Sequence, residues 1–167
     1  MDPLLTYPLI LLSFCFIALS WFAGSDAPYV ATKMELIKKV LIKAGLKKGK
    51  TFYELGSGDG RVVFEAAKLG GKAIGIEQSW LRVLWSKYVA FKLGLSQAYF
   101  YHGNIFKRSY QDGDVVYIYL LQHAVNRLEE KLSKELRKGS TIITQRYHFQ
   151  NLKPKFKEGD FWIYQIT

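Results

Sequence analysis

Three glycines spaced at i, i+2 and i+4 constrain the fold of this chain more than any other feature. They lie in the run Glu54-Leu55-Gly56-Ser57-Gly58-Asp59-Gly60-Arg61, directly after the apolar-rich Thr51-Phe52-Tyr53. Glycine lets a chain turn tightly out of a strand and pass close to a ligand where a Cβ would collide. Apolar side chains recur from Arg61 to Leu69 and predict a short helix whose N-terminal amides face this turn. The run therefore predicts a strand, a ligand-binding loop and a helix.

A second strand ends in an acid, at Ile74-Gly75-Ile76-Glu77. A carboxylate at such a strand end can accept two hydrogen bonds from a ribose diol. The dinucleotide-binding fingerprint spaces its glycines as G-x-G-x-x-G, whereas here the third glycine comes one residue early and Arg61 stands in its place. The spacing favours a nucleoside-containing cofactor other than NAD.

Segments typical of strands alternate with segments of helical periodicity. The predicted strands are 51–55, 72–77, 98–102, 114–120, 140–146 and 161–166, with Phe156 in a short strand before the last, and the predicted helices are 61–69, 79–93 and about 124–138. In the last helix Val125, Leu128, Leu132 and Leu136 are predicted to be core, and Glu129, Glu130, Lys131 and Lys134 a solvated face. The alternation implies βαβ units and an α/β, doubly wound, mainly parallel sheet of six or seven strands.

The first segment, Leu4 to Ala23, is a run of twenty uncharged residues. As a helix it would rise about 30 Å, the thickness of a hydrocarbon core. We expect a single transmembrane helix. A cleaved signal peptide is the alternative, although only Asp2 and no basic residue precedes the run.

Charge predicts how such a span is oriented. Lys33, Lys38 and Lys39 follow the span and no Lys or Arg precedes it, so the rest of the chain is expected on the cytoplasmic side. Gly24-Ser25-Asp26-Ala27-Pro28 has the composition of a linker, and Thr32 with Glu35 has the pattern of a helix capping box. The predicted organisation is an anchor and linker over 1–27 and one domain over 28–167.

The predicted domain is strongly basic. All 24 Lys and Arg follow residue 28, together with 12 of the 14 acids, which leaves this part at +12. Each suitably placed cation contributes about 1 kcal/mol of attraction to an anionic membrane surface; solvated lysines on helix faces are the alternative interpretation. No nucleic-acid-binding module is evident, so nucleic acid is not expected as a partner. The single cysteine, Cys15, excludes an intramolecular disulfide, and the three histidines lack the spacing of metal ligands.

The motifs resemble those of the class I S-adenosylmethionine-dependent methyltransferases. More narrowly, Pro28-Tyr29-Val30-Ala31-Thr32, the run from Glu54 to Arg61, and Tyr119-Leu120-Leu121 before a helix with Asn126 resemble a family of protein-lysine methyltransferases. Its animal members modify the c subunit of ATP synthase and the adenine nucleotide translocase. The resemblance covers about residues 28–167. It implies a Rossmann-like sheet whose last strands are antiparallel, usually preceded by a helix that this sequence lacks.

The resemblance implies S-adenosyl-L-methionine as the cofactor and a set of residues that bind it. Glu54 would lie near its ammonium group and Glu77 would take the ribose hydroxyls. Asn104 would accept a hydrogen bond from the adenine amine, and Ile105 would pack on the adenine face. Asp59 is either a further cofactor residue or the N-cap of the next helix. The backbone amides near the cofactor's carboxylate and ribose would come from Gly56, Ser57, Gly58 and Gly60.

The end of the fourth predicted strand bears on the substrate, because ligands bind at the carboxyl edge of open α/β sheets. Related enzymes that methylate planar nitrogens carry Asn/Asp-Pro-Pro-aromatic there, whereas this chain has Tyr119-Leu120-Leu121-Gln122 and lacks both prolines. That difference argues against planar nitrogen substrates, and it fits the lysine specificity that the family resemblance implies. A desolvated aromatic pocket lowers the pKa of an ammonium group without a dedicated base. The candidate walls are Tyr29 and Tyr119, with Tyr147 and Phe149; core packing is the alternative for each.

The sequence thus favours a membrane-anchored protein-lysine N-methyltransferase that acts on a membrane protein near an anionic bilayer surface. Two alternatives stay open. One is a degenerate cofactor-binding module that serves as a membrane scaffold, because the chain is short and shows no side-chain base. The other is a methyltransferase for RNA or for a small molecule.

Overall fold

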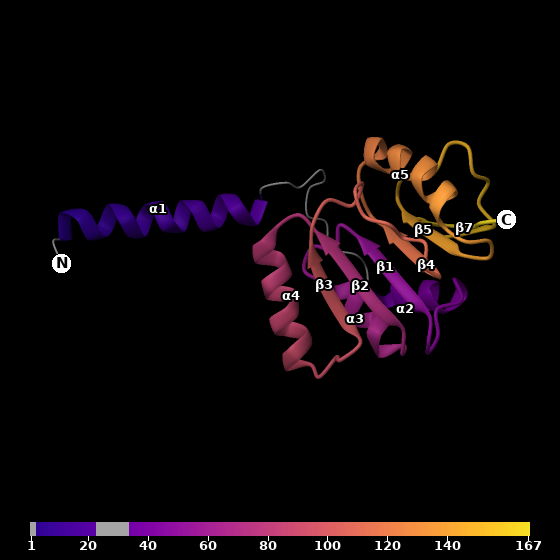
Figure 1. The fold of residues 1–167 in the computed structure, drawn as a ribbon, viewed down its shortest axis with the longest axis horizontal. Coiled ribbons are helices and arrows are strands. Elements are labelled where there is room, and N and C mark those ends of the chain that lie inside the picture. The colour runs from indigo at the N-terminus through magenta and orange to yellow at the C-terminus, as the bar shows by residue number, and fades with distance from the viewer. Residues whose placement is uncertain (1–2, 23–33) are drawn as a thin grey trace.

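The structure, a computed structural model, describes residues 3–22 and 34–167. Its strands are β1 (Thr51–Leu55), β2 (Lys72–Glu77), β3 (Ala98–His102), β4 (Val115–Ile118), β5 (Thr141–Gln145), β6 (Phe156–Glu158) and β7 (Phe161–Gln165). Its helices are α1 (Pro3–Phe22), α2 (Met34–Lys43), α3 (Arg61–Lys68), α4 (Trp80–Lys92) and α5 (Gln122–Glu135). The seven strands form one sheet in the order β3-β2-β1-β4-β5-β7-β6 (Figure 1).

The winding of the sheet reverses at β1. This strand pairs in parallel with β2 on one side and with β4 on the other. Beyond them β3 pairs in parallel with β2, and β5 with β4. In open sheets of this kind ligands bind at the carboxyl ends of the strands, where the strand order reverses. The topology therefore places the candidate site at the end of β1, where the glycine run begins.

The last two strands run against the others. β7 is antiparallel to β5, and β6 is antiparallel to β7. The sheet therefore has seven strands, and the antiparallel orientation implied by the family resemblance is confirmed. Residues 146–155, between β5 and β6, contain no helix, in agreement with the sequence.

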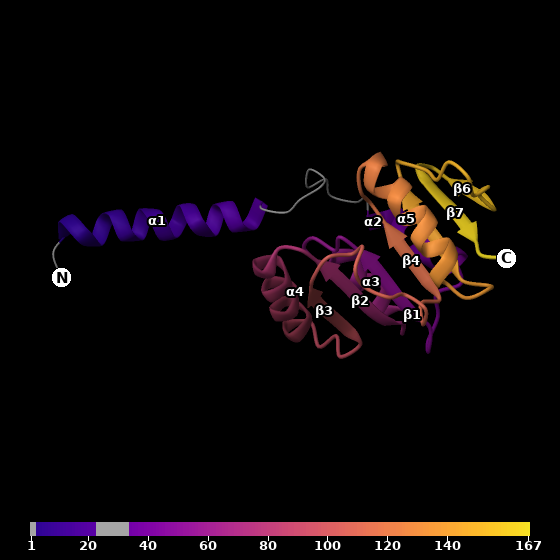
Figure 2. The ribbon, with the colours of Figure 1, turned by 45° about the horizontal axis from the view of Figure 1, so that its top comes forward.

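Buried apolar side chains cover both faces of the sheet. One cluster joins the sheet to α2, α3 and the inner face of α4, and includes Phe52 of β1 and Phe100 of β3. The other joins the opposite face to α5, which crosses in front of β4 in Figure 2. Strands buried on both faces read in sequence as near-continuous apolar runs, and helices on both sides confirm the doubly wound class.

Several predicted details are corrected by the structure. The fourth strand, expected over 114–120, covers only Val115–Ile118, because the chain leaves the sheet at Tyr119. The helix expected from about residue 124 begins two residues earlier, at Gln122. Glu129, expected on a solvated face, is only 4% exposed. Helical spacing from Val125 places Glu129 beside the core stripe, and the chain segment after β5 covers it.

α1 is an apolar helix with exposed side chains, of which Leu9 and Phe16 are examples. No helix in the described part of the chain is both long enough and apolar enough to cross a membrane. The transmembrane helix expected over Leu4–Ala23 is therefore not supported. The predicted linker and the capping residue Thr32 lie outside the described residues.

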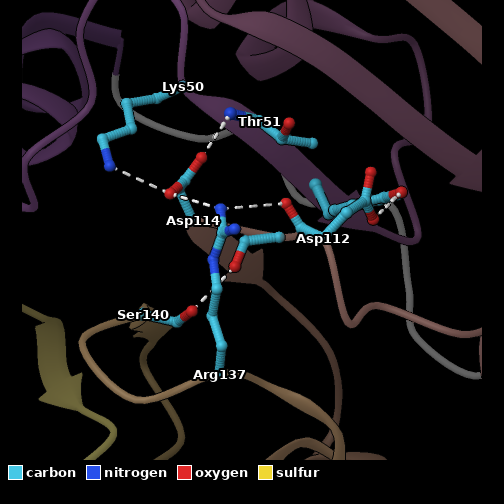
Figure 3. Close-up of polar contacts among 8 residues, drawn as sticks. Lys50, Thr51, Asp112, Asp114, Arg137 and Ser140 are labelled. Atoms are coloured by element: carbon cyan, nitrogen blue, oxygen red, sulfur yellow. Dashed lines mark hydrogen bonds and ion pairs between the residues drawn. The ribbon is translucent and has the colours of Figure 1, made fainter.

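An ion-pair network closes the amino edge of the sheet (Figure 3). Asp114, which precedes β4, accepts hydrogen bonds from Lys50 Nζ (3.0 Å) and Arg137 Nη2 (2.8 Å). Its second oxygen accepts from the backbone N–H of Thr51 (2.8 Å). Partial burial by itself raises the pKa of Asp114, but the bonds from Thr51 and Lys50 outweigh it, so this pKa lies below its ordinary value. The network ties β1, β4 and the segment after α5 together at the edge opposite the candidate site.

Candidate functional site

The glycine run forms a tight loop between β1 and α3. Gly56, Gly58 and Gly60 have φ angles of +82°, +53° and +81°, which residues with a Cβ rarely adopt. A Cβ on Gly56 would lie 2.9 Å from Leu120 Cδ2, and one on Gly60 would lie 2.6 Å from the ring of Phe100. The backbone and the close packing of the loop both require glycine at this spacing.

The backbone N–H groups of the loop are bonded within the site itself. The N–H groups of Gly56 (2.9 Å) and Ser57 (3.0 Å) both donate to the Ile76 carbonyl. The Gly58 N–H donates to Glu77 Oε2 (2.9 Å), and the Gly60 N–H donates to the Ser57 carbonyl (2.8 Å). The sequence analysis expected these amides to lie near a cofactor, and that expectation stays a prediction. In the structure their bonds hold the loop in shape, so the loop offers a ligand close approach to its backbone.

Glu54, the fourth residue of β1, is 6% exposed. Its carboxyl group accepts a hydrogen bond from the Val63 backbone N–H, whereas its Oε2 is buried without a hydrogen-bond partner among the described residues. Burial raises the pKa of Glu54 well above its ordinary value, and the neighbouring Asp59 carboxylate raises it further. A buried, half-satisfied carboxyl group is costly. A cationic group of a ligand at Oε2 would remove that cost, so this position fits an ammonium group.

Glu77 joins the glycine loop to the start of α4. It is buried at the end of β2, and its two oxygens accept from the backbone N–H groups of Gly58 and Ser79, each at 2.9 Å. A carboxylate has about four lone-pair directions, so each oxygen can accept one more hydrogen bond. Glu77 is also close enough to raise the pKa of Glu54. The two carboxyl groups therefore flank one loop.

Asp59 lies one residue before the N-cap of α3. The N-cap residue is Gly60, which has no side chain that could cap the helix. Asp59 instead pairs with Arg61, accepting from its Nε (3.0 Å) and from its backbone N–H (3.3 Å). Of the two roles expected for Asp59, that of helix N-cap is wrong, and the contact with a cofactor stays a prediction.

Asn104 and Ile105 follow β3 at the same edge of the sheet. Oδ1 of Asn104 accepts from the Phe106 backbone N–H (2.8 Å), a local turn that asparagine often forms. Ile105 is buried in the cluster on the α5 side, where the Tyr110 hydroxyl donates to its carbonyl (2.7 Å). Asn104 therefore stabilises a local turn and Ile105 is part of the core, and their contact with an adenine stays a prediction.

The chain after β4 forms one wall of the loop. Leu120 lies directly against Gly56. Tyr119 is half-buried and packs against the cluster on the α2 and α3 side of the sheet. Tyr29, which the sequence pairs with Tyr119 in positioning a substrate lysine, lies outside the described residues.

A strained turn follows β5. Arg146 has a φ of +66°, and the Tyr147 N–H donates to the Gln145 carbonyl at 2.8 Å. A γ-turn with positive φ at its centre is rare and strained, and such strain often occurs at functional sites. Beyond the turn Tyr147 is half-buried. Phe149 is buried against Tyr164, with ring centroids 4.7 Å apart, so core packing, the alternative that the sequence left open, is correct for Phe149.

Gln145 is a buried polar residue of this edge that the sequence analysis missed. Its Oε1 accepts from the Tyr117 hydroxyl, and its Nε2 donates to Asp160 Oδ2 (3.2 Å). The signal that could have found it was a polar residue at the end of an apolar strand, the same signal that identified Glu77. Gln145 fixes the end of β5 to the end of β4 and to the β6–β7 turn.

Comparisons with known proteins agree with this fold and site. The family model of the ANTKMT methyltransferase domain matches residues 54–162, and that of the histone methylation protein DOT1 matches residues 19–82. The chain is similar to the lysine N-methyltransferase of the ATP synthase c subunit from Mus musculus, with 30% identity over 145 residues, 84% of this chain and 58% of the relative. It therefore spans about six-tenths of the length of that relative.

Two further similarities cover more of the matched protein. A protein-lysine N-methyltransferase of Saccharolobus islandicus is 30% identical over 131 residues, 77% of this chain and 81% of the relative. The crystal structure of an RNA methyltransferase from Salinibacter ruber in complex with S-adenosyl-L-homocysteine has a TM-score of 0.76 and 26% identity, and covers 82% of this chain and 94% of that one. The domain match, the relatives and the shared sheet establish that this chain belongs to the ANTKMT methyltransferase-domain family.

Proposed function

We propose that this chain is an S-adenosylmethionine-dependent protein-lysine N-methyltransferase. The observation that carries the proposal is Glu54 Oε2, buried and without a partner in the described structure, beside a positive-φ glycine loop at the reversal point of the sheet. The site fits a ligand that carries a cationic amine and a ribose. The names of the relatives, which are protein-lysine N-methyltransferases, support the reaction class.

Each residue of the site has a proposed task toward the cofactor, which supplies an electrophilic methyl group when bound. Glu54 holds the ammonium group through its unpaired oxygen. Glu77 accepts from the ribose hydroxyls with the lone pairs that Gly58 and Ser79 leave. Asn104 and Ile105 bind the adenine. The remaining contacts come from the loop, through Gly56, Ser57, Gly58, Asp59 and Gly60.

The protein's main contribution to methyl transfer is positioning. The lysine nitrogen must lie about 3 to 3.5 Å from the methyl group, along the axis of displacement. Tyr119, half-buried beside the loop, is proposed to position the lysine chain together with Tyr29. Partial desolvation between aromatic rings lowers the pKa of the lysine ammonium, so the amine is formed without a dedicated base.

The test is transfer of radiolabelled methyl from S-adenosylmethionine by the full chain to membrane proteins and, separately, to total RNA. We expect label in protein, located on lysine by mass spectrometry, and its loss in Glu54→Gln. An absence of label in every protein fraction would contradict the proposal. Cofactor binding without any transfer would favour the scaffold alternative.

RNA methylation is the second candidate, because the Salinibacter ruber structure is that of an RNA methyltransferase and nearly its whole length is matched. The same experiment separates the two candidates. Label in RNA that is lost with Glu54→Gln, with none in protein, would establish the RNA activity in place of the lysine activity.

For localisation we propose that α1 attaches the chain to a membrane, with the domain of residues 28–167 on the cytoplasmic side and a membrane protein as substrate. The exposed apolar side chains of α1 and the net charge of +12 after residue 28 support attachment to an anionic surface. The named substrate of the mouse relative, a component of ATP synthase, supports a membrane protein. Recovery of the full chain in the soluble fraction of lysed cells, or protection of the domain from protease added to the cytoplasmic side, would contradict this placement.

A further inference from the structure

We propose that the outer face of α4 is a membrane-docking surface that binds an anionic lipid bilayer. We call this surface the α4 aromatic face and define it by its exposed side chains, which are Trp80, Leu84, Trp85, Tyr88 and Phe91. The proposal rests neither on methyl transfer nor on insertion of α1.

Both sides of α4 are apolar, but the described part of the chain covers only one of them. The inner side packs on the sheet through Val83, Ser86 and Ala90, all of them buried. The side chains of the α4 aromatic face are exposed by 46% (Trp80), 53% (Leu84), 48% (Trp85), 53% (Tyr88) and 82% (Phe91). Their spacing of i, i+4, i+8 and i+11 from Trp80 aligns four of them along one side of the helix.

An uncovered aromatic stripe of this kind requires a partner. Aromatic side chains bury about 150 to 250 Å² each when they are covered. Contiguous exposed apolar patches on soluble domains mark interaction or membrane sites. Single exposed apolar residues are ordinary, but five on one four-turn helix are not.

The charges around the stripe favour lipid as that partner. Residues 78–111, which include α4 and β3, contain no Asp or Glu and five Lys and Arg, of which Arg82 is buried. Lys87 and Lys92 are exposed on α4 itself, and Lys92 Nζ lies 5.8 Å from the centroid of the Tyr88 ring. Trp and Tyr flanked by lysine are typical of segments that lie in the membrane interface. Lysine is depleted at protein–protein interfaces, so a protein partner fits this composition less well.

The position of α4 is consistent with docking. α4 contacts α1, and it lies on the side of the domain from which α1 extends in both views (Figure 1 and Figure 2). The apolar helix and the α4 aromatic face can therefore meet the same bilayer. α4 begins three residues after Glu77, so docking would hold the carboxyl edge of the sheet close to the lipid surface.

The test uses the full chain and tryptophan fluorescence at a single site. Substituting Phe for Trp21, Trp80 and Trp162 leaves Trp85 as the only tryptophan. The matched control carries Ile42→Trp with all four native tryptophans replaced, because Ile42 is exposed to a similar extent (52%) on α2. Both proteins are bound to vesicles of phosphatidylcholine and phosphatidylserine with brominated acyl chains, which quench tryptophan only at the depth of the lipid chains.

We expect emission from Trp85 to fall about twofold or more, as for a side chain buried about 5 to 10 Å into the interface, while the Ile42→Trp control is not quenched. Adding Phe91→Glu should reduce the quenching of Trp85 to the control level without changing the far-ultraviolet circular dichroism. Bound protein with unquenched Trp85, or equal quenching of both proteins, would overturn the proposal. Shielding of Trp85 that depends on protein concentration without vesicles would assign the face to a second copy of the chain instead. None of these outcomes depends on methyl transfer.

Discussion

The ionisation of Glu54 has opposite effects on the stability of the ligand-free fold and on the binding of a cationic ligand. Because its pKa in the folded chain is raised, the folded state favours its protonated form. The contribution of this group to stability is therefore complete below the unfolded pKa of about 4.3 and is lost as the pH rises through the folded pKa. A cationic ligand at Oε2 favours the ionised form and reverses this trend.

Glu54→Gln should stabilise the ligand-free protein at neutral pH, because the amide has no charge to desolvate. We expect the Tm to rise by about 2 to 4 °C, or about 1 kcal/mol for a chain of this size. Affinity for S-adenosylmethionine should fall about tenfold or more, because a charged hydrogen bond is lost. Thermal unfolding and calorimetric titration measure the two effects, and Glu130→Gln, which alters an exposed carboxylate, should change neither. A lower Tm with unchanged affinity would contradict this account.

Arg146 occupies a conformation that costs a side-chain residue free energy. Its φ of +66° is unstrained for glycine, so Arg146→Gly should raise the free energy of unfolding by about 1 kcal/mol, whereas the β-branched Arg146→Val should lower it by about as much. Urea unfolding of the two variants measures the difference. Equal midpoints for the Gly and Val variants would show that the turn is not strained.

At the scale of elements, the segment after β5 is held by α5. The two Glu129 oxygens accept the backbone N–H groups of Gln150 (3.0 Å), Asn151 (2.7 Å) and Leu152 (2.7 Å). Gln122, in the first turn of α5, donates to the His148 carbonyl (2.9 Å). Together these bonds fix the segment between the Arg146 turn and β6 without a helix of its own.

Glu129→Ala should lower the free energy of unfolding by about 3 kcal/mol, because it leaves several buried donors without an acceptor. Amide hydrogen exchange at 150–152 should accelerate more than elsewhere in the domain. Glu130→Ala is the matched control, since its side chain is exposed on the same helix. If both variants lost the same stability, the Glu129 carboxylate would not be the anchor of this segment.

At the scale of the whole molecule, the two edges of the sheet differ in how their charged and polar groups are paired. The amino edge is closed by the Asp114 network, in which each charge has a partner. The carboxyl edge holds the strained turn, the positive-φ loop and a buried oxygen of Glu54 that has no hydrogen-bond partner among the described residues. We expect this difference of an α/β domain that binds its ligand at the carboxyl ends of its strands: its charges are paired at the amino edge, and polar groups that a ligand can bind lie at the carboxyl edge.

Asp114→Asn should lower the free energy of unfolding by about 1 kcal/mol at pH 7, since solvent partly screens its two ion pairs. Because the pKa of Asp114 is lowered in the folded state, its contribution is present above the unfolded pKa of about 3.9. It should disappear as the pH falls through the lower folded value. Urea midpoints at neutral and acid pH measure this, and a difference between wild type and variant that does not shrink in acid would contradict it.

Much of the fold could be predicted because its signals are local. The first three strands have the predicted limits, since each is a short apolar run that ends at a polar or glycine residue. The glycine spacing at 56, 58 and 60 predicted the loop for the same reason. The end of β4 and the start of α5 could not be predicted to the residue. The strand ends where the chain leaves the sheet at Tyr119, and the helix begins at Gln122, and both points depend on tertiary packing.

The sequence by itself determined the α/β class, the position of the candidate site and its two acids, Glu54 and Glu77. Only the tertiary structure decided what these groups face: the loop amides are already bonded, Glu54 Oε2 is unpaired in the described structure, and Glu129 is buried. It alone decided which apolar side of α4 is covered. The physical reason is that turn and strand propensities act over a few residues, whereas burial and hydrogen-bond partners depend on segments far apart in the chain.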